Sequence, residues 1–167
     1  MKEKANKTNA ARILDRLQIS YELKTYEVDE SDLSAPHVAE TAGLPLEMVY
    51  KTLVLRGDKS GVIMAVIPGG KELALKALAA ASGNKRTEMV PLKEVFTLTG
   101  YIRGGCSPLG AKKNYPVYID ASALRLDKIA ISAGKRGEQI IIAPQDLIAA
   151  TRAQTADIAV EETLIKQ

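Results

Sequence analysis

The sequence predicts a single α+β domain in which a mixed, mostly antiparallel sheet is surrounded by helices. Its 167 residues suit one domain. Strand and helix patterns are interleaved without the regular strand–helix–strand rhythm of a doubly wound fold. Short glycine-containing loops between apolar runs are typical of hairpins. We assign residues 1–167 to this domain, although the sequence after about residue 155 predicts no element.

The first half of the chain changes between helical and strand-like apolar spacing. Apolar side chains recur at helical spacing from Ala10 to Leu17, whereas the residues from Tyr21 onward alternate as in a strand. Ser34 can cap a helix that Gly43 closes. The elements expected in this half are a helix within 8–19, a strand at 21–28, a helix at 34–43, a helical turn after residue 45, and strands at 50–55 and 62–67 joined by a hairpin loop.

The second half follows the same signals. Gly83 and Gly100 each follow a helical segment, and Asp120 can cap a short helix. A turn that reads Ala-Gly-Lys-Arg-Gly joins the last two strands. The elements expected here are helices at 72–81, 91–98, 121–124 and 144–153, and strands at 86–90, 117–119, 129–132 and 139–142.

The composition excludes two large classes of catalytic chemistry. The chain has one histidine, His37, and one cysteine, Cys106, so a zinc site of the usual kind cannot be assembled. His37 opens a predicted helix with no nucleophile signature nearby, which argues against a catalytic triad. We therefore expect no metal and no cofactor. An enzyme of this composition would act by positioning and electrostatics.

Charge and hydropathy limit the location and the partners. The net charge of +3 is too small to indicate a nucleic-acid partner by itself. No apolar run reaches the ~20 residues of a membrane span, and the first residues lack the apolar core of a secretory signal. A single cysteine fits a reducing compartment. We expect a cytoplasmic protein without a membrane segment.

The most informative segment is Gly100–Lys113, which reads Gly-Tyr-Ile-Arg-Gly-Gly-Cys-Ser-Pro-Leu-Gly-Ala-Lys-Lys. Its glycines and Pro108 disfavour both a helix and a regular strand. Glycine lets a ligand approach the backbone N–H groups, and Arg103, Lys112 and Lys113 add positive charge. The segment predicts a loop that binds an anion or a carbonyl or phosphate oxygen. A structural turn is the alternative.

Two short motifs add further cations. Lys51 and Thr52 interrupt an apolar strand, and lysine is rarely buried without a partner. The alternative is an edge strand whose lysine is solvated and blocks edge pairing. Lys135 and Arg136 lie in the turn Gly134–Gly137, which is either part of a binding site or an ordinary hairpin turn with exposed cations.

The tyrosines and the cysteine also allow two interpretations each. Tyr21 and Tyr26 lie on one predicted strand and could form a wall for a nucleobase or side chain, with strand packing as the alternative. A nucleophilic role for Cys106 is disfavoured, because no histidine nearby in sequence could activate it. A lone buried cysteine usually behaves as a small hydrophobic residue.

Taken together, the Lys51-Thr52 pair, the Gly-Gly-Cys-Ser-Pro loop and the Gly-Lys-Arg-Gly turn resemble the YbaK/EbsC family. These proteins are free-standing relatives of the editing domain of bacterial prolyl-tRNA synthetase. The resemblance runs over most of the chain and implies the editing-domain fold. It also implies a deacylase of mischarged Cys-tRNA(Pro), in which the substrate's thiol attacks its own ester carbonyl and releases the tRNA.

The resemblance assigns roles to particular residues. Lys51 matches the family's essential lysine, suited to the phosphate or ribose of the terminal adenosine. Gly104–Pro108 matches the Gly-x-x-x-Pro loop, whose N–H groups would hold the ester carbonyl. The catalytic residues expected are Lys51, Gly104, Gly105 and Ser107. The substrate-binding residues expected are Tyr21, Tyr26, Thr52, Arg103, Cys106, Pro108, Lys112, Lys135 and Arg136.

Three alternatives to this function stay open. Ala-tRNA(Pro) is a competing substrate, because small pockets discriminate poorly by size. Several relatives place an acid at the position of Gln139, whereas the acid here is Glu138, so the amino-acid preference is not fixed. The chain could also bind tRNA ends without catalysis, or carry basic loops only as surface. The expected partners are the aminoacyl-tRNA acceptor end and, transiently, prolyl-tRNA synthetase; the sequence does not indicate an oligomeric state.

Overall fold

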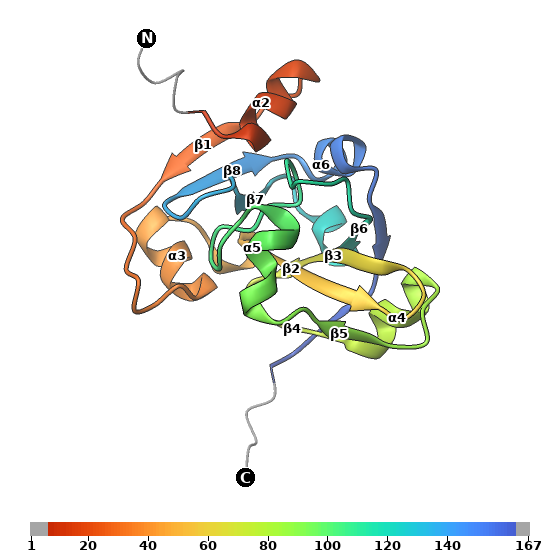
Figure 1. Cartoon of the computed structure of the whole chain (residues 1–167). Helices are drawn as coiled ribbons and strands as arrows, with labels where there is room; N and C mark the ends of the chain where they lie inside the picture. The colour runs from red at the N-terminus through yellow and green to blue at the C-terminus, as the bar shows by residue number, and fades with distance from the viewer. Residues whose placement is uncertain (1–6, 163–167) are drawn as a thin grey trace.

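A computed structural model describes residues 7–162, which form five α-helices and three β-sheets (Figure 1). The largest sheet has five strands in the order β5 (Thr87–Met89), β2 (Tyr50–Gly57), β3 (Gly61–Pro68), β6 (Val117–Asp120) and β9 (Gln154–Ala156). β2 is antiparallel to both of its neighbours, whereas β6 is parallel to both of its neighbours.

A second sheet lies against the start of β2. It contains three antiparallel strands in the order β1 (Glu22–Thr25), β8 (Glu138–Ile142) and β7 (Ile129–Ser132). A parallel bridge between Val49 and Ala130 connects the two sheets. The short strands β4 (Glu72–Leu73) and β10 (Ala159–Val160) form a separate antiparallel pair. Antiparallel pairing predominates, which confirms the predicted α+β class.

Each predicted helix has a counterpart in the structure, and several of the predicted caps are observed. They are α2 (Asn9–Arg16), α3 (Ala35–Ala42), α4 (Leu75–Ser82), α5 (Leu92–Thr99) and α6 (Pro144–Thr151), with 3-10 helices η1 (Leu46–Met48) and η2 (Ala121–Arg125). Side chains of Thr8 and Ser34 accept hydrogen bonds from the first turns of α2 and α3. Glycines in the left-handed conformation end α3, α4 and α5.

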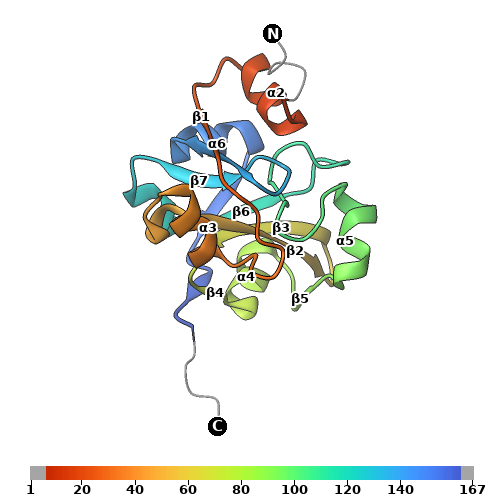
Figure 2. The same cartoon turned by 90° about the vertical axis from the view of Figure 1, so that its left-hand side faces the viewer.

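The five-stranded sheet separates two apolar layers. α4 covers one face, where Leu78 packs with Leu55 from β2. The other face is covered by the three-stranded sheet together with α2, α5 and α6, which contribute Leu14, Val95 and Leu147. Figure 2 shows α4 below the sheet and α2 and α6 above it. This coverage on both sides explains why β3 is a continuous apolar run rather than an alternating strand.

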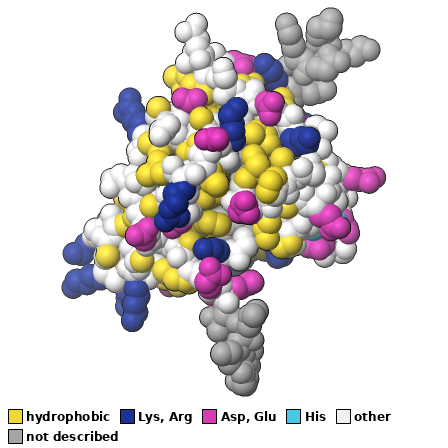
Figure 3. All heavy atoms as spheres, turned by 180° about the vertical axis from the view of Figure 1, so that it is seen from behind, with side chains coloured by type: hydrophobic (Ala, Val, Ile, Leu, Met, Phe, Trp, Pro, Cys, Tyr) yellow, Lys and Arg dark blue, Asp and Glu magenta, His cyan; other side chains and the backbone are white. Residues whose placement is uncertain are grey.

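The surface carries both signs of charge. Acidic and basic side chains are interspersed with apolar atoms on the face seen in Figure 3. The small positive net charge is therefore not gathered there as a single basic patch. Among residues 7–162, no helix combines the length and apolar character needed to cross a bilayer.

Three predicted elements differ from the structure. The helix predicted at 72–81 begins only at Leu75, because Glu72–Leu73 pairs with β10. The strand predicted at 21–28 is confined to β1, an edge strand whose four residues are all exposed. The segment after residue 155, where no element was predicted, completes β9 and supplies β10. The other elements differ only at their ends.

Candidate active site

A cavity of about 480 Å³ opens beside the first half of β2. Its lining comes from the start of α3, from β2, from the chain that joins β5 to α5, from the loop after α5, and from the facing ends of β7 and β8. The fold thus brings together segments that are far apart in the sequence. Both sheets contribute to the wall.

The cavity lies along an open edge of β2. β3 pairs with all of Tyr50–Gly57, whereas β5 pairs only with Leu55–Gly57. The carbonyl of Val54 accepts a hydrogen bond from Val90 N at 3.0 Å, so the backbone groups of Val54 point away from β3. Because these directions alternate along a strand, the N–H and C=O of Thr52 also point to the open edge.

Lys51 is half-buried in the cavity wall. Burial lowers the pKa of its ammonium from the ordinary 10.5, and the negative charges of Glu162 and Glu72 oppose this shift. Within residues 7–162, Lys51 makes no ion pair. A partly desolvated cation without a partner interacts more strongly with an anionic ligand than a solvated one does.

Two adjacent glycines let the loop after α5 approach its neighbours closely. Gly104 has φ of 84°, a left-handed conformation that favours glycine. A Cβ atom there would lie 3.4 Å from the side chains of Leu33 and Arg136. A Cβ atom on Gly105 would lie 3.2 Å from the Cα atom of Lys135. Glycine at both positions therefore allows the loop to press against the turn between β7 and β8.

The backbone of this loop is only partly used by its own contacts. The N–H of Gly105 donates within the turn at 2.8 Å, and the carbonyl of Arg103 accepts from Arg136 Nε at 2.8 Å. No acceptor within residues 7–162 is found for the N–H groups of Gly104 and Cys106, and both residues line the cavity. These two amides are therefore among the donors that the loop can offer to a ligand.

The rest of the loop is fixed by tyrosines and by the facing turn. The hydroxyl of Tyr101 donates to the Leu109 carbonyl, and that of Tyr115 donates to the Leu98 carbonyl at 2.6 Å. Burial raises the pKa of Tyr101 to about 12, so its donor proton is retained at neutral pH. A Cβ atom on Gly134, in the facing turn, would lie 3.1 Å from the Tyr101 ring. The loop is therefore held from two sides.

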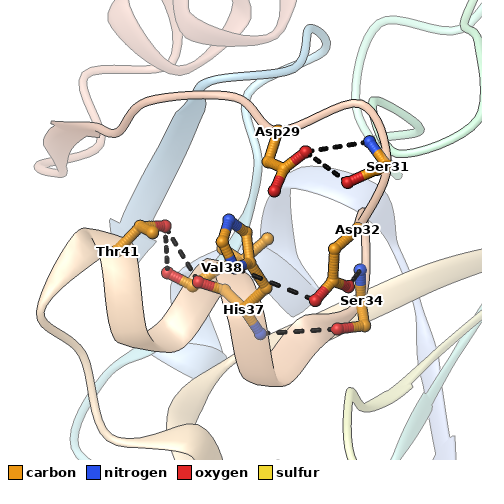
Figure 4. Close-up of polar contacts among 7 residues, drawn as sticks. All are labelled: Asp29, Ser31, Asp32, Ser34, His37, Val38 and Thr41. Atoms are coloured by element: carbon orange, nitrogen blue, oxygen red, sulfur yellow. Dashed lines mark hydrogen bonds and ion pairs between the residues drawn. The ribbon is translucent and has the colours of Figure 1, made fainter.

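The segment Leu33–Pro36 also lines the cavity, beside Gly104, and local capping fixes its shape (Figure 4). Asp32 accepts a hydrogen bond from Ser34 N at 3.1 Å, and Ser34 Oγ accepts from His37 N at 3.4 Å. The His37 ring lies 3.8 Å from the Asp32 carboxylate. His37 does not line the cavity.

Cys106 lines the cavity but is a poor nucleophile. Burial raises the pKa of its thiol to about 11, so the thiol stays protonated at neutral pH. Its Sγ lies 3.8 Å from the Ile102 carbonyl, a weak contact. This agrees with the expectation that Cys106 acts as a small apolar residue.

Comparison with known proteins identifies the family of this site. The aminoacyl-tRNA editing domain family matches residues 30–150, which is most of the chain. The chain belongs to this family. EbsC of Enterococcus faecalis, named as a candidate Cys-tRNA(Pro)/Cys-tRNA(Cys) deacylase, is 46% identical over 161 residues, which are 96% of this chain and 98% of EbsC. The predicted family is therefore confirmed.

Two further relatives link this editing-domain protein to prolyl-tRNA synthetase. The crystal structure of a candidate trans-editing enzyme for that synthetase matches with a TM-score of 0.75 and 25% identity, over 91% of this chain and 97% of that one. The proline–tRNA ligase of Thermosipho africanus is 34% identical over 76 residues, which are 46% of this chain and 13% of the ligase. The editing-domain fold predicted from the sequence is confirmed.

In this editing-domain protein, the predicted site residues fall into three groups. The first group lines the cavity and consists of Lys51, Thr52, Arg103, Gly104 and Cys106. These residues come from β2 and from the loop after α5, which the sequence separates by about fifty positions. Their common location is a geometric finding, and their catalytic and binding roles stay predictions.

The second group supports the loop without lining the cavity. Gly105 packs against the facing turn, and Arg136 holds the Arg103 carbonyl. Ser107 is fully buried, and its hydroxyl accepts a hydrogen bond from the backbone of the same loop at 3.3 Å. Pro108 lines a second cavity on the other side of the loop.

The third group lies elsewhere. Lys112 Nζ lies 5.4 Å from the centre of the Phe96 ring, and Lys135 Nζ lies 3.9 Å from Glu138 Oε1. The Tyr21 hydroxyl donates to Asp15 of α2 at 2.8 Å, and Tyr26 packs against the cluster around α3. None of these side chains lines the cavity. For the two tyrosines, the structure favours the packing alternative.

Sequence reasoning did not place several cavity residues in the site. Ser132 and Gln139 face each other across β7 and β8 and both line the cavity. Gly69 follows β3, and a Cβ atom there would lie 2.2 Å from the Cβ atom of Ala35, so glycine is needed where α3 begins. The adjacent glycines Gly69 and Gly70 were the available signal of this close approach.

Proposed function

We propose that this chain deacylates Cys-tRNA(Pro) in trans, with cleavage assisted by the thiol of the substrate. The observation that carries the proposal is the convergence of Lys51 with the unused amides of Gly104 and Cys106 on one cavity. The name of EbsC, to which the chain is 46% identical, supports the same substrate class.

The proposed roles follow from the positions of these groups. The N–H groups of Gly104 and Cys106 would donate to the ester carbonyl as negative charge develops on its oxygen. The Lys51 ammonium would bind the phosphate or ribose of the terminal adenosine. Arg103, which lines the same cavity, would add a second cation for the acceptor end.

The proposed reaction needs no nucleophile from the protein. The substrate's thiol loses its proton, and its sulfur attacks the carbonyl carbon of the same cysteinyl group. The bond from that carbon to the ribose oxygen then breaks, and the ribose oxygen takes up a proton. The products are the free tRNA and a cyclic thiolactone. Holding the thiol against the carbonyl lowers the barrier, because the ordering cost has already been met on binding.

A comparison of three charged tRNAs tests this reaction. We expect turnover of Cys-tRNA(Pro) and little turnover of Ala-tRNA(Pro) or Ser-tRNA(Pro), because neither of these carries a thiol. Equal rates on the cysteinyl and alanyl substrates would exclude the thiol mechanism and favour an alanine deacylase. Binding without turnover of any of the three would favour a tRNA-end-binding module.

We also propose a transient complex with prolyl-tRNA synthetase as the source of tRNA selectivity. The proposed site contacts only the acceptor end, which Cys-tRNA(Pro) shares with other charged tRNAs. Adding the synthetase is expected to raise the rate on Cys-tRNA(Pro) relative to Cys-tRNA(Cys). An unchanged ratio over a range of synthetase concentrations would contradict this partner.

A further inference from the structure

Two buried polar atoms have no hydrogen-bond partner in the part of the chain that the structure describes. They are Thr52 Oγ1 and Gln139 Oε1. Gln139 is only 5% exposed, so water compensates little of its side chain. Buried polar side-chain atoms are nearly always paired in folded proteins, and an exception calls for a ligand or a functional reason.

Both atoms belong to the same cavity, although they come from different sheets. β2 and β7 run side by side from the bridge between Val49 and Ala130. Two residues further along β7, Ser132 lies opposite Gln139 of β8. Lys51 and Thr52 lie two and three residues further along β2, so Thr52 and Gln139 both lie in the region where the two sheets join.

The neighbouring hydroxyl does not satisfy either atom. Ser132 Oγ accepts a hydrogen bond from Gly134 N at 3.0 Å. No hydrogen bond joins it to Thr52 or Gln139. The two oxygens therefore have no partner in the described chain, and both belong to residues that line the cavity.

The chemistry of the two oxygens restricts what can bind there. An amide oxygen only accepts, and a threonine hydroxyl can accept or donate. A ligand must therefore supply N–H or strong O–H donors, and a thiol is only a weak donor. An aminoacyl ester carries a suitable group next to its carbonyl, the α-amino group, which has up to three N–H donors.

We propose that Gln139 and Thr52 form the subsite that binds the α-amino group of the aminoacyl ester. This inference rests on the proposed function, and it adds the contact that orients the amino acid within the cavity. The loop amides of Gly104 and Cys106 bind the carbonyl from one side. The α-amino contact fixes the Cα substituents from the other side, which aims the thiol at the carbonyl.

The absence of charge on the Gln139 side chain affects the Lys51 ammonium in the same cavity. A carboxylate at position 139 would attract the ammonium of Lys51, which lines the same cavity and has no ion pair in the described chain. Gln139 accepts a hydrogen bond from the substrate without offering that competing charge. Lys51 thereby stays available for the tRNA end.

The test combines near-isosteric variants with a substrate that lacks the amino group. Gln139→Met and Thr52→Val remove the acceptors and keep the side-chain size. The substrates are Cys-tRNA(Pro) and 3-mercaptopropionyl-tRNA(Pro), which keeps the thiol and the ester. Gln154→Met and Thr155→Val, at exposed positions of β9, are the matched controls.

We expect each cavity variant to lose about tenfold in kcat/KM on Cys-tRNA(Pro), the factor that one hydrogen bond to a charged donor contributes. On the substrate without the amino group we expect no further loss, because the contact is already absent. Equal losses on both substrates, or no loss on either, would overturn the subsite. The β9 controls should match the wild type on both.

Thermal stability separates a binding role from a structural one. Replacing an unpaired buried polar atom by an apolar group is expected to leave the melting temperature of the free protein unchanged or to raise it. A clear drop in melting temperature for both cavity variants would indicate that the two side chains serve the fold instead, which contradicts the proposal.

A binding measurement keeps this inference separate from the proposed reaction. The probes are adenosine carrying cysteine through a 3′-amide and the same compound without the amino group. Amino-dependent binding that Gln139→Met abolishes would support the subsite even if the wild type turned over no substrate. Turnover with equal affinity for the two probes would leave the proposed function standing and overturn the subsite.

Discussion

The loop from Gly100 to Lys113 separates two cavities of similar size and different character. The cavity beside β2 has a volume of about 480 Å³ and contains a half-buried lysine and two unpartnered buried oxygens. The cavity behind the loop has a volume of about 520 Å³ and is lined by three exposed cations, Arg16, Lys113 and Arg152. The same loop contributes a wall to each.

The difference teaches that the proposed site of chemistry is distinguished by the burial of its polar groups more than by the number of its charges. Exposed cations are screened by water and salt, so each contributes little to a specific contact. A cation or an amide that has lost its water interacts more strongly with a ligand and has a fixed direction. A count of charges along the sequence would favour the cavity behind the loop, whereas desolvation favours the one beside β2.

The largest expected effect contrasts the lysines of the two cavities. Lys51→Ala is expected to lower kcat/KM on Cys-tRNA(Pro) about a hundredfold or more, since it removes a desolvated electrostatic contact. Lys113→Ala should cost less than about threefold, because this ammonium is solvated. Initial deacylation rates at matched enzyme concentration measure both. Equal losses of kcat/KM for the two variants would contradict the proposal that the half-buried lysine matters more than the solvated one.

Next in size is a contrast between two glycines of the loop. Gly104→Ala and Gly110→Ala each place a side chain at positive φ, at a cost of about 1–2 kcal/mol. A Cβ atom on Gly110 would also lie 2.8 Å from the Tyr101 hydroxyl, so this variant should be the less stable of the two. Gly104→Ala should lose more activity per folded molecule, about tenfold, because it displaces a carbonyl donor.

Chemical denaturation and deacylation rates, measured on the same preparations, check this pair. If Gly110→Ala proved the less active variant after correction for its folded fraction, the result would contradict the proposed role of Gly104 and favour the part of the loop around Gly110.

A smaller effect concerns the pH response of Lys51. Its folded pKa lies below 10.5, so between the two values the folded chain binds fewer protons than the unfolded chain, and this group makes stability rise with pH there. Activity that needs the ammonium should fall at a pH below 10.5. Glu162→Gln should lower the pKa of Lys51 further, because Glu162 raises it. NMR titration of the labelled lysine measures both values, and a titration at or above 10.5 would contradict the desolvation of this side chain.

The smallest effect is expected for the cysteine. Cys106→Ala should change kcat/KM by less than about twofold, because a thiol with a pKa of about 11 supplies almost no thiolate at neutral pH. The reactivity of the wild-type thiol toward iodoacetamide should be low at pH 7 and rise only in alkali. A large loss of activity in this variant would contradict this expectation and support a nucleophilic role for Cys106.

Local sequence signals were sufficient for most of the fold. The strands β2 and β3 follow from two apolar runs on either side of a glycine-containing loop, and the helix ends follow from Ser34, Gly43 and Gly83. β10 was missed because two residues carry no measurable periodicity. Its pairing with Glu72–Leu73 also shortened the helix expected from residue 72.

The sequence predicted those residues of the candidate site that belong to recognisable short motifs. The glycine loop and Lys51 were identified from composition and resemblance, and both line the cavity. Gln139 and Leu33 enter it only through pairing and packing with distant segments, which no local pattern encodes. Tyr21 was expected in the site from the family resemblance and as one of two tyrosines that could form a wall, whereas its hydroxyl donates to Asp15 of α2.

Within residues 7–162, one isolated bridge, between Val49 and Ala130, connects the two sheets, so a ligand that contacts both sheets would add a second connection. Thr52 belongs to one sheet and Gln139 to the other. An amino group bound by both side chains would therefore connect the two sheets. The loaded protein should then resist unfolding more than the empty one, with a gain that grows with the logarithm of ligand concentration. The decrease in amide hydrogen-exchange rate on ligand binding should be largest in β7 and in the first residues of β2, next to the bound amino group.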